Sequence, residues 1–207
     1  MTNKGNYYEG TWKNDSMHGY GLLIKSNGNY IIGEWSENKL HGYADLHCKN
    51  GDFFKGNWKN GLKDGTGYEF IMGGTRYEGD FREGKKCGYG KIFFPKGNVY
   101  EGEISEGRIC GDGRMDWPDG KYYDGIWKDD KIHGKGLFVY DKVQNYRGEY
   151  NMGSKHGFGE MVYADGRIYR GNFLNGEQYG EGKMISPGPE GKILMCRDGK
   201  VLDDSWD

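Results

Sequence analysis

Apolar and polar residues alternate in short runs along this chain, and residues 77–99 show the pattern most plainly. An aromatic residue or glycine at positions 77, 79 and 81 alternates with a charged residue at 78, 80 and 82. Alternation with a period of two predicts a β-strand that has one aromatic face and one polar face. The stretches E-G-K-K (83–86) and P-K-G-N (95–98) have the composition of turns. A second short strand is expected between them, around Gly90–Phe94, so that the segment forms a β-hairpin.

The same hairpin pattern recurs along the whole chain with a period of 23 residues. Glycine columns keep this spacing over eight copies, and no helical periodicity interrupts them. Self-similarity at a fixed period predicts a repeat array in which each hairpin stacks on its neighbours. The two most regular columns are Gly10, Gly33, Gly56, Gly79, Gly102, Gly125, Gly148 and Gly171, and then Gly19, Gly42, Gly65, Gly88, Gly111, Gly134, Gly157 and Gly180.

The stretch GDFREGKK (79–86) is nearly the glycine-rich loop that binds nucleotide phosphates. That loop requires Ser or Thr after its lysine to hold Mg²⁺, and it lies between a strand and a helix. Lys86 stands where the hydroxyl residue is needed, and Gly84 is matched in other repeats by Asp15, Asn38 or Asp130. A phosphate site would not tolerate these replacements, so we interpret the stretch as one hairpin among eight.

Aromatic residues occupy the first and the fifth position of the repeat in seven of eight copies each. A glycine lies between these positions on the same strand face, which leaves room for a ring to lie across the backbone. A lone hairpin is not stable, but stacked hairpins share one apolar layer. We therefore predict that these rings form the core and are not a platform for stacking bases. The predicted core aromatics include Tyr8, Trp12, Trp35, Trp58, Tyr77, Tyr100, Tyr123, Trp127, Tyr146 and Tyr169.

The motif Y-E-G-x-W-K-x-G-x-x-H-G-x-G resembles the MORN (membrane occupation and recognition nexus) repeat. It is seen as YEGTWKNDSMHGYG at 8–21 and as YDGIWKDDKIHGKG at 123–136. The resemblance implies an all-β fold, an elongated single-layer antiparallel β-solenoid of 23-residue hairpin repeats. The chain is most similar to the MORN-only cytoskeletal scaffold proteins of protozoan parasites. This similarity implies a non-enzymatic, rod-like scaffold that self-associates and docks cytoskeletal or membrane-associated protein partners.

The repeat register divides the chain into three parts. Residues 1–7 are in register with the end of a repeat, residues 8–191 form eight repeats, and residues 192–207 form a degenerate ninth half-repeat with a tail. Repeat arrays need polar caps, and the register starts without one. We therefore expect a fragment of a longer array.

The last predicted strand and the tail are unusually apolar for the end of an array. An open strand edge either is guarded or pairs with another strand. We favour a homodimer in which two such ends meet about a two-fold axis. In the alternative, the tail turns near Pro187 and Pro189 and covers its own edge. The predicted dimer residues are Ile193, Leu194, Met195, Cys196, Val201, Leu202 and Trp206.

Composition limits the partners and the compartment. The formal net charge of −2 gives no basic field that would attract nucleic acid or an anionic membrane. No apolar stretch approaches the roughly 20 residues of a membrane span, and the N-terminus lacks the apolar segment of a signal peptide. The four cysteines are scattered, which favours a reducing cytosol. We predict a cytoplasmic protein at the cytoskeleton or at submembrane structures.

Candidate chemistry is limited to one column of the repeat. Four of the five histidines recur just before the second glycine, which favours a role in the turn over one as a catalytic base. No catalytic constellation can be nominated, so we predict no enzyme activity and no bound cofactor. The one metal candidate is an interchain zinc at a dimer interface, held by Cys110 and His133 together with ligands from a second chain. Equivalent positions of adjacent hairpins lie too far apart for a disulfide between Cys87 and Cys110.

Basic residues gather in or beside one predicted turn, which would make one edge of the array basic. This edge either keeps the array soluble and blocks edge pairing, which we favour, or docks anionic lipid or an acidic polymer. Three functional classes follow: a protein scaffold, which we predict, a phosphoinositide- or anionic-membrane-binding module, or a targeting appendage of a larger enzyme. Bulk lipid binding is expected to be weak or absent. The predicted edge residues are Lys13, Lys39, Lys59, Lys63, Arg82, Lys85, Lys86, Arg108, Lys128, Lys131 and Lys155.

Overall fold

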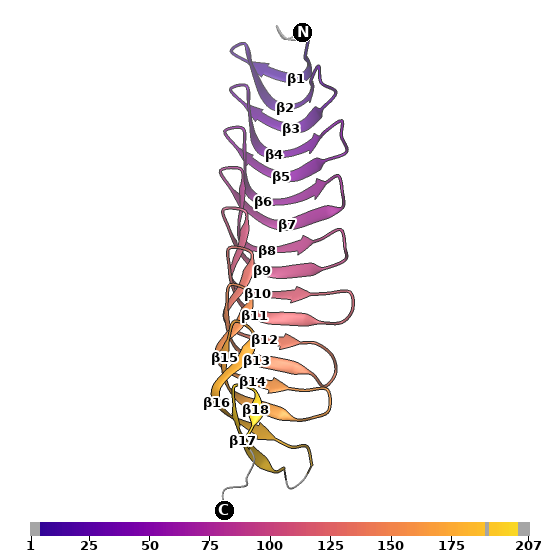
Figure 1. Cartoon of the computed structure of the whole chain (residues 1–207). Coiled ribbons are helices and arrows are strands. Elements are labelled where there is room, and N and C mark those ends of the chain that lie inside the picture. The colour runs from indigo at the N-terminus through magenta and orange to yellow at the C-terminus, as the bar shows by residue number, and fades with distance from the viewer. Residues whose placement is uncertain (1–4, 189–190, 203–207) are drawn as a thin grey trace, which may run out of the picture. The chain divides into compact units, whose positions relative to one another are not determined.

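The computed structural model describes residues 5–188 and 191–202, and all regular elements of this part of the chain are strands. The chain divides into two compact units, 1–108 and 109–207. Within each unit every strand pairs antiparallel with the strand that follows it, so that hairpins stack side by side in one layer (Figure 1). The predicted all-β, single-layer antiparallel arrangement of hairpin repeats is confirmed.

The strands alternate between shorter and longer ones in both units. Unit 1 contains β1 (Tyr7–Lys13), β2 (Ser16–Ile24), β3 (Tyr30–Ser36), β4 (Lys39–His47), β5 (Phe53–Lys59), β6 (Leu62–Ile71), β7 (Thr75–Arg82), β8 (Lys85–Phe93) and β9 (Val99–Ser105). The next strand, β10 (Arg108–Asp116), begins at the last residue of unit 1 and otherwise lies in unit 2. Unit 2 also contains β11 (Tyr122–Lys128), β12 (Lys131–Val139), β13 (Asn145–Asn151), β14 (Ser154–Val162), β15 (Ile168–Leu174), β16 (Glu177–Ile185), β17 (Ile193–Arg197) and β18 (Lys200–Val201).

The turn inside each hairpin consists of only two residues. Between β7 and β8 these are Glu83 and Gly84, with φ of 50° and 85°. Two positive φ values define the tight turn that matches the twist of paired strands, and they favour Gly, Asn or Asp. This requirement explains why Asp15 and Asn38 replace Gly84 in other repeats. It also shows that 79–86 is an antiparallel hairpin and not a phosphate loop.

The second strand of each hairpin is longer than the sequence pattern predicted. β8 begins at Lys85 and not near Gly90, because the turn occupies two residues where we expected four. Gly79 pairs with Gly90 and Asp80 with Cys87, so Gly88 and Tyr89 bulge out without partners in β7. Gly88 has a φ of +66° and recurs in every repeat because a side chain there would be strained.

A tyrosine ring covers a pair of glycines in the centre of most hairpins. Tyr77 is fully buried, and a Cβ atom added to Gly90 would lie 2.5 Å from its Cε2 atom. The Tyr77 hydroxyl donates a hydrogen bond to the carbonyl oxygen of Asp80 at 2.9 Å. The glycines are therefore needed on this side of the sheet, which we call the ring face.

The rings interlock between hairpins in edge-to-face contacts. Phe81 lies 5.2 Å from Tyr77 of its own repeat and 5.0 Å from Phe54 of the preceding one, at interplanar angles of 80° and 84°. Trp58 adds a hydrogen bond from Nε1 to the carbonyl oxygen of Ala44 at 3.2 Å. Each hairpin thus contributes half of the packing that buries its neighbour's rings.

The predicted core aromatics lie on the ring face, with one exception in burial. Trp12 is 51% exposed, because no hairpin precedes β1 in the described residues to cover its indole ring. Trp35 and Trp58 occupy the same repeat position as Trp12, but each is preceded by a hairpin that covers its ring. They are 5% and 8% exposed. Also buried are Tyr8, Tyr77, Tyr100, Tyr123, Trp127, Tyr146 and Tyr169.

Candidate functional site

The opposite side of each sheet, which we call the groove face, lacks the tyrosine cover. It carries the side chains that alternate with the rings along each strand. In unit 2 the glycines of four adjacent strands are cross-strand neighbours, so their backbone forms a continuous floor. This floor is made by Gly125, Gly136, Gly148 and Gly159.

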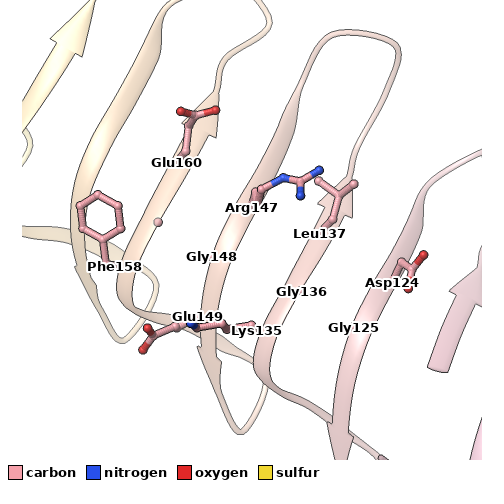
Figure 2. A pocket seen from close by; sticks show the side chains of 11 residues that line it. Asp124, Gly125, Lys135, Gly136, Leu137, Arg147, Gly148, Glu149, Phe158 and Glu160 are labelled. Carbon is pink, nitrogen blue, oxygen red and sulfur yellow. The ribbon is translucent and has the colours of Figure 1, made fainter. Parts of the chain in front are cut away.

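Two rows of side chains border this glycine floor and enclose a groove of about 710 Å³ (Figure 2). Because the floor has no side chains, a ligand could approach the backbone closely. The walls mix an aromatic ring, an aliphatic side chain and both charge signs. One row holds Lys135, Glu149 and Phe158, and the other holds Asp124, Leu137, Arg147 and Glu160.

Unit 1 contains a groove of the same construction, with a volume of about 410 Å³. Gly56 and Gly67 form its floor, and Tyr43 and Tyr68 stand on opposite sides. The remaining lining residues are Lys55, Thr66 and Glu78. The groove therefore recurs with the repeat and is not an accident of one hairpin.

Exposed tyrosines follow one repeat position along the groove face of unit 1. Tyr20, Tyr43 and Tyr89 are 62%, 51% and 61% exposed. They lie in the bulge of their strands, as Tyr89 does in β8, and this position directs the rings outward. Their hydroxyl groups make no hydrogen bond with the described residues. We call these three residues the tyrosine row.

A second aromatic row lies on the same face, where the strands meet the longer connections. Tyr30 stacks on His47 at 4.6 Å with an interplanar angle of 8°, and His47 lies 5.9 Å from Phe53. Phe53 in turn lies 5.5 Å from Phe70. These cross-strand partners are only partly buried, and we call them the stacked row. Charged side chains such as Asp45, Lys55 and Glu78 lie between the two aromatic rows, so this open face presents exposed rings on both sides of a polar centre. Aromatic residues are enriched at protein interfaces.

The groove face of unit 1 carries both charge signs, and carboxylates stand opposite two members of the tyrosine row, Glu34 opposite Tyr20 and Glu103 opposite Tyr89. Two of its basic residues are paired there, Lys55 with Asp45 at 3.1 Å and Lys91 with Glu101 at 3.1 Å. The face carries the carboxylates Glu9, Glu34, Asp45, Glu78, Asp80, Glu101 and Glu103 and nearly as many basic residues, Lys13, Lys55, Lys59, Arg76, Arg82 and Lys91. In unit 2 the corresponding positions also hold nearly equal numbers of both signs, so the tyrosine row and not the net charge distinguishes the two faces.

The expected basic edge is not built as the sequence suggested. Lys86 is the cross-strand partner of Phe81, so its side chain lies on the ring face and not in the turn. Its Nζ atom is 5.0 Å from the centroid of the Tyr77 ring. Lys63 and Lys155 occupy the same repeat position and likewise lie over aromatic rings. Burial among these rings lowers the pKa of the Lys155 ammonium group.

Two of these lysines hold a carboxylate on the ring face. Glu69 stands where other repeats have an apolar residue, and it pairs with Lys63 and, at 2.8 Å, with Lys86. Burial raises the pKa of Glu69, but the hydrogen bonds from the two lysines outweigh it, and the pKa is lowered. The basic residues that remain at the turn edge alternate with acidic ones, and Lys85 pairs there with Glu106.

The histidine column contributes hydrogen bonds to the turns. His133 Nδ1 accepts a bond from the backbone N–H of Met152 at 3.4 Å, and Asp64 accepts the equivalent bond from Glu83 at 3.2 Å. None of the four cysteines, which all lie in the described residues, forms a disulfide. Within the described residues, no cluster of three or more potential metal ligands is found. The interchain zinc at Cys110 and His133 stays a prediction.

The proposed dimer residues divide between two environments. β17 and β18 form a short hairpin, in which Cys196 pairs with Val201 and is itself fully buried. Cys196 is therefore not available to a second chain. Exposed apolar side chains remain at Ile193, Met195, Val201 and Leu202. Trp206 lies outside the described residues.

Our reading of the sequence missed both aromatic rows. The tyrosine row had a visible signal, because residues 20, 43 and 89 share one position of the 23-residue repeat. The stacked row had none, because it combines residues from the end of one strand and the start of the next. Only the strand register brings these two repeat positions together.

Comparisons with known proteins identify the class of this chain. A model of the MORN repeat matches residues 8–30, 32–53, 54–75, 77–99, 100–122, 123–142, 146–166 and 169–188. The chain belongs to the MORN repeat family. A search of curated proteins finds no significant match. Within the described part of the chain, no helix has the length and apolarity that a membrane span requires.

Among solved structures, the chain is similar to the TCP10 domain of Danio rerio CPAP. The wild-type domain is 15% identical with a TM-score of 0.52, over 98% of this chain and 96% of that chain. The same domain in complex with a peptide of Danio rerio STIL is 13% identical with a TM-score of 0.38, over 93% and 99%. The TCP10c domain of Drosophila melanogaster Sas-4 is 14% identical with a TM-score of 0.31, over 91% and 98%. The first likeness shows the fold alone.

Proposed function

We propose that this chain is a non-enzymatic protein-interaction scaffold whose groove face binds extended segments of partner proteins. One observation carries the proposal: both units have a glycine-floored groove on the face opposite the core. In unit 1 this groove is flanked by exposed aromatic rings, and aromatic residues contribute most strongly to protein interfaces. We place this scaffold in the cytoplasm, at the cytoskeleton or at submembrane structures.

Binding to anionic lipid is the weaker alternative, because the turn edge lacks an uninterrupted basic surface. Lys63, Lys86 and Lys155 lie on the ring face, and Lys85 is paired with Glu106. We expect little co-sedimentation with phosphoinositide-containing vesicles at physiological salt. The double variant Glu83→Lys/Glu106→Lys should bind vesicles better, because it makes the edge basic. Strong, salt-resistant binding by the unmodified chain would favour the lipid alternative.

The scaffold proposal is tested by selecting ligands for the whole chain from a random peptide library. The selected peptides are then titrated calorimetrically against groove variants, Tyr43→Ser in unit 1 and Phe158→Ser in unit 2. Matched controls are Met72→Ser and Val143→Ser, which remove exposed apolar side chains from the longer connections. Loss of affinity in the groove variants alone supports the proposal. The proposal is refuted if the selected peptides bind all four variants as tightly as the original chain, or if an exhaustive selection yields no ligand.

We propose in addition that the chain self-associates through its last hairpin. The observation that favours this is that the last hairpin leaves four apolar side chains exposed, at Ile193, Met195, Val201 and Leu202. Exposed apolar patches mark contact surfaces. If the interchain zinc at Cys110 and His133 also exists, a chelator should lower the molar mass of the assembly. An unchanged molar mass would show that zinc does not hold the interface together.

A further inference from the structure

We propose that the groove face of unit 1 binds a proline-rich segment that carries arginine or lysine and adopts the polyproline II conformation. The segment runs across the strands, one turn per hairpin. This inference rests on the proposed function, because it names the class of partner that the groove face takes. The observations behind it are the spacing of the tyrosine row, the free hydroxyl groups of these tyrosines, and the carboxylates that stand opposite two of them.

The distance between successive hairpins matches the length of one turn of a polyproline II helix. Neighbouring strands lie about 4.7–4.9 Å apart, so successive hairpins repeat every 9.4–9.8 Å or so. A polyproline II helix has three residues per turn and rises about 3.1 Å per residue, which gives a repeat of about 9.3 Å. Every third residue of such a segment therefore meets the same repeat position of successive hairpins. Tyr20, Tyr43 and Tyr89 occupy one such position, with Thr66 between the last two.

Other regular conformations do not keep this match. A β-strand repeats its side-chain direction about every 6.6–6.8 Å, and an α-helix completes a turn in about 5.4 Å. Either segment would lose register with the tyrosine row within one or two hairpins. The groove also offers side chains and a glycine floor, whereas an added strand would require a free strand edge.

The chemistry of the row fits this ligand. Proline rings pack well on exposed aromatic surfaces, and proline-rich segments are recognised by aromatic-lined grooves. A polyproline II backbone has no internal hydrogen bonds, so its carbonyl groups need donors. The hydroxyl groups of Tyr20, Tyr43 and Tyr89 can supply them, because they make no hydrogen bond with the described residues.

Carboxylates beside the tyrosine row select among proline-rich segments. Tyr20 lies opposite Glu34 and Tyr89 lies opposite Glu103 on the next strand. Glu78 lines the groove itself, and Lys55, which also lines it, is paired with Asp45. Basic residues in the segment would lie beside these carboxylates, and acidic ones would be repelled. The groove face of unit 2 has only Phe158 at the tyrosine position, beside Asp112, Lys135 and Glu181, so we assign the segment to unit 1.

The experiment compares three synthetic peptides with the whole chain by fluorescence anisotropy. (Pro-Pro-Arg)₄ is the probe, (Gly-Ser-Arg)₄ has the same charge without the conformation, and (Pro-Pro-Glu)₄ has the conformation with the opposite charge. We expect (Pro-Pro-Arg)₄ to bind at least tenfold more tightly than either control peptide. Equal binding of (Pro-Pro-Arg)₄ and (Gly-Ser-Arg)₄ would show a charge effect alone and would overturn the proposal, as would no binding at all.

Variants then locate the site. Tyr43→Ser should weaken the binding of (Pro-Pro-Arg)₄ at least fivefold, and Met72→Ser should leave it unchanged. Circular dichroism and the thermal midpoint show whether Tyr43→Ser folds normally, and Tyr89→Ser provides a second groove variant if it does not. Affinity that survives both tyrosine substitutions places the peptide elsewhere and refutes the assignment.

The outcomes separate this inference from the proposed function. If library selection yields ligands that depend on Tyr43 but lack proline, the groove binds partner segments and the polyproline assignment is wrong. If no ligand depends on the groove residues, both proposals fail.

Discussion

At the scale of single residues, one ring and two glycines depend on each other. Tyr77 lies across Gly79 and Gly90, and the same arrangement recurs in most hairpins. In the second repeat both the ring and one of the glycines are replaced together. There Ile31 replaces the tyrosine and Ala44 replaces a glycine, because the shorter side chain leaves room for a methyl group.

This dependence predicts the outcome of a double-mutant cycle. Gly90→Ala should destabilise the chain by about 1–3 kcal/mol, since the methyl group overlaps the Tyr77 ring. In the double variant Tyr77→Ile/Gly90→Ala the overlap is gone, so the loss should be smaller than the sum of the single losses by about 0.5–3 kcal/mol. Urea unfolding of the four proteins measures the coupling. Strictly additive losses would contradict the packing described for this hairpin.

At the scale of elements, the two-residue turn sets the register of each hairpin. Both of its residues have positive φ, which residues other than Gly, Asn and Asp adopt at a cost. Met152 occupies such a position with a φ of 48°, where Asn14, Asn60 and Asn175 stand in other repeats. This turn is therefore strained by its sequence alone.

Met152→Asn should stabilise the chain by about 1 kcal/mol, because asparagine accepts the left-handed conformation more readily than methionine does. The reverse change Asn175→Met should destabilise it by a similar amount. Both effects are measured as shifts in the chemical unfolding midpoint. The expected role of the turn would be wrong if Met152→Asn lowered the midpoint.

The ion cluster of Lys63, Glu69 and Lys86 joins β6 and β8 on the ring face. Because the pKa of Glu69 is lowered in the folded state, its contribution to stability is present above the ordinary value of 4.5 and is lost as the pH falls through the folded value. Removing Glu69 alone, as in Glu69→Leu, leaves two partly buried lysines without their carboxylate and should cost about 1–3 kcal/mol at pH 7.

The triple variant Lys63→Leu/Glu69→Leu/Lys86→Ile gives this hairpin pair the apolar residues of other repeats. It should be as stable as the original chain at pH 7, or more stable by up to about 4 kcal/mol. Its stability should also fall less between pH 5 and pH 3. Unfolding curves at these pH values test both statements, and an unchanged pH dependence would exclude Glu69 as its source.

At the scale of the whole molecule, we propose that the last hairpin decides whether chains associate. Truncation after Glu190 removes β17 and β18 together with their exposed apolar side chains. We expect light scattering to show a dimer for the full chain and a monomer for the truncated one. A dimer that survives truncation would place the interface elsewhere, and two monomers would end the self-association proposal.

The sequence by itself determined the repeat, the hairpins and the buried rings of this protein. Hairpins contact mainly their neighbours, so a local pattern such as Tyr77-Gly79-Phe81, repeated every 23 residues, contains most of the information about the layer. The ring across the glycines was predictable for the same reason, because the ring and the two glycines that it covers belong to one hairpin.

Only the tertiary structure decided which face the remaining side chains occupy. Because the turn is two residues long and not four, Lys86 pairs with Phe81 and joins the ring face, whereas composition placed it at a basic edge. The bulge at Gly88 and Tyr89 then directs the tyrosine row outward. The stacked row likewise depends on register, since His47 meets Tyr30 and Phe53 only when strands pair. Register is a property of paired backbones, so no single strand pattern reveals the groove face.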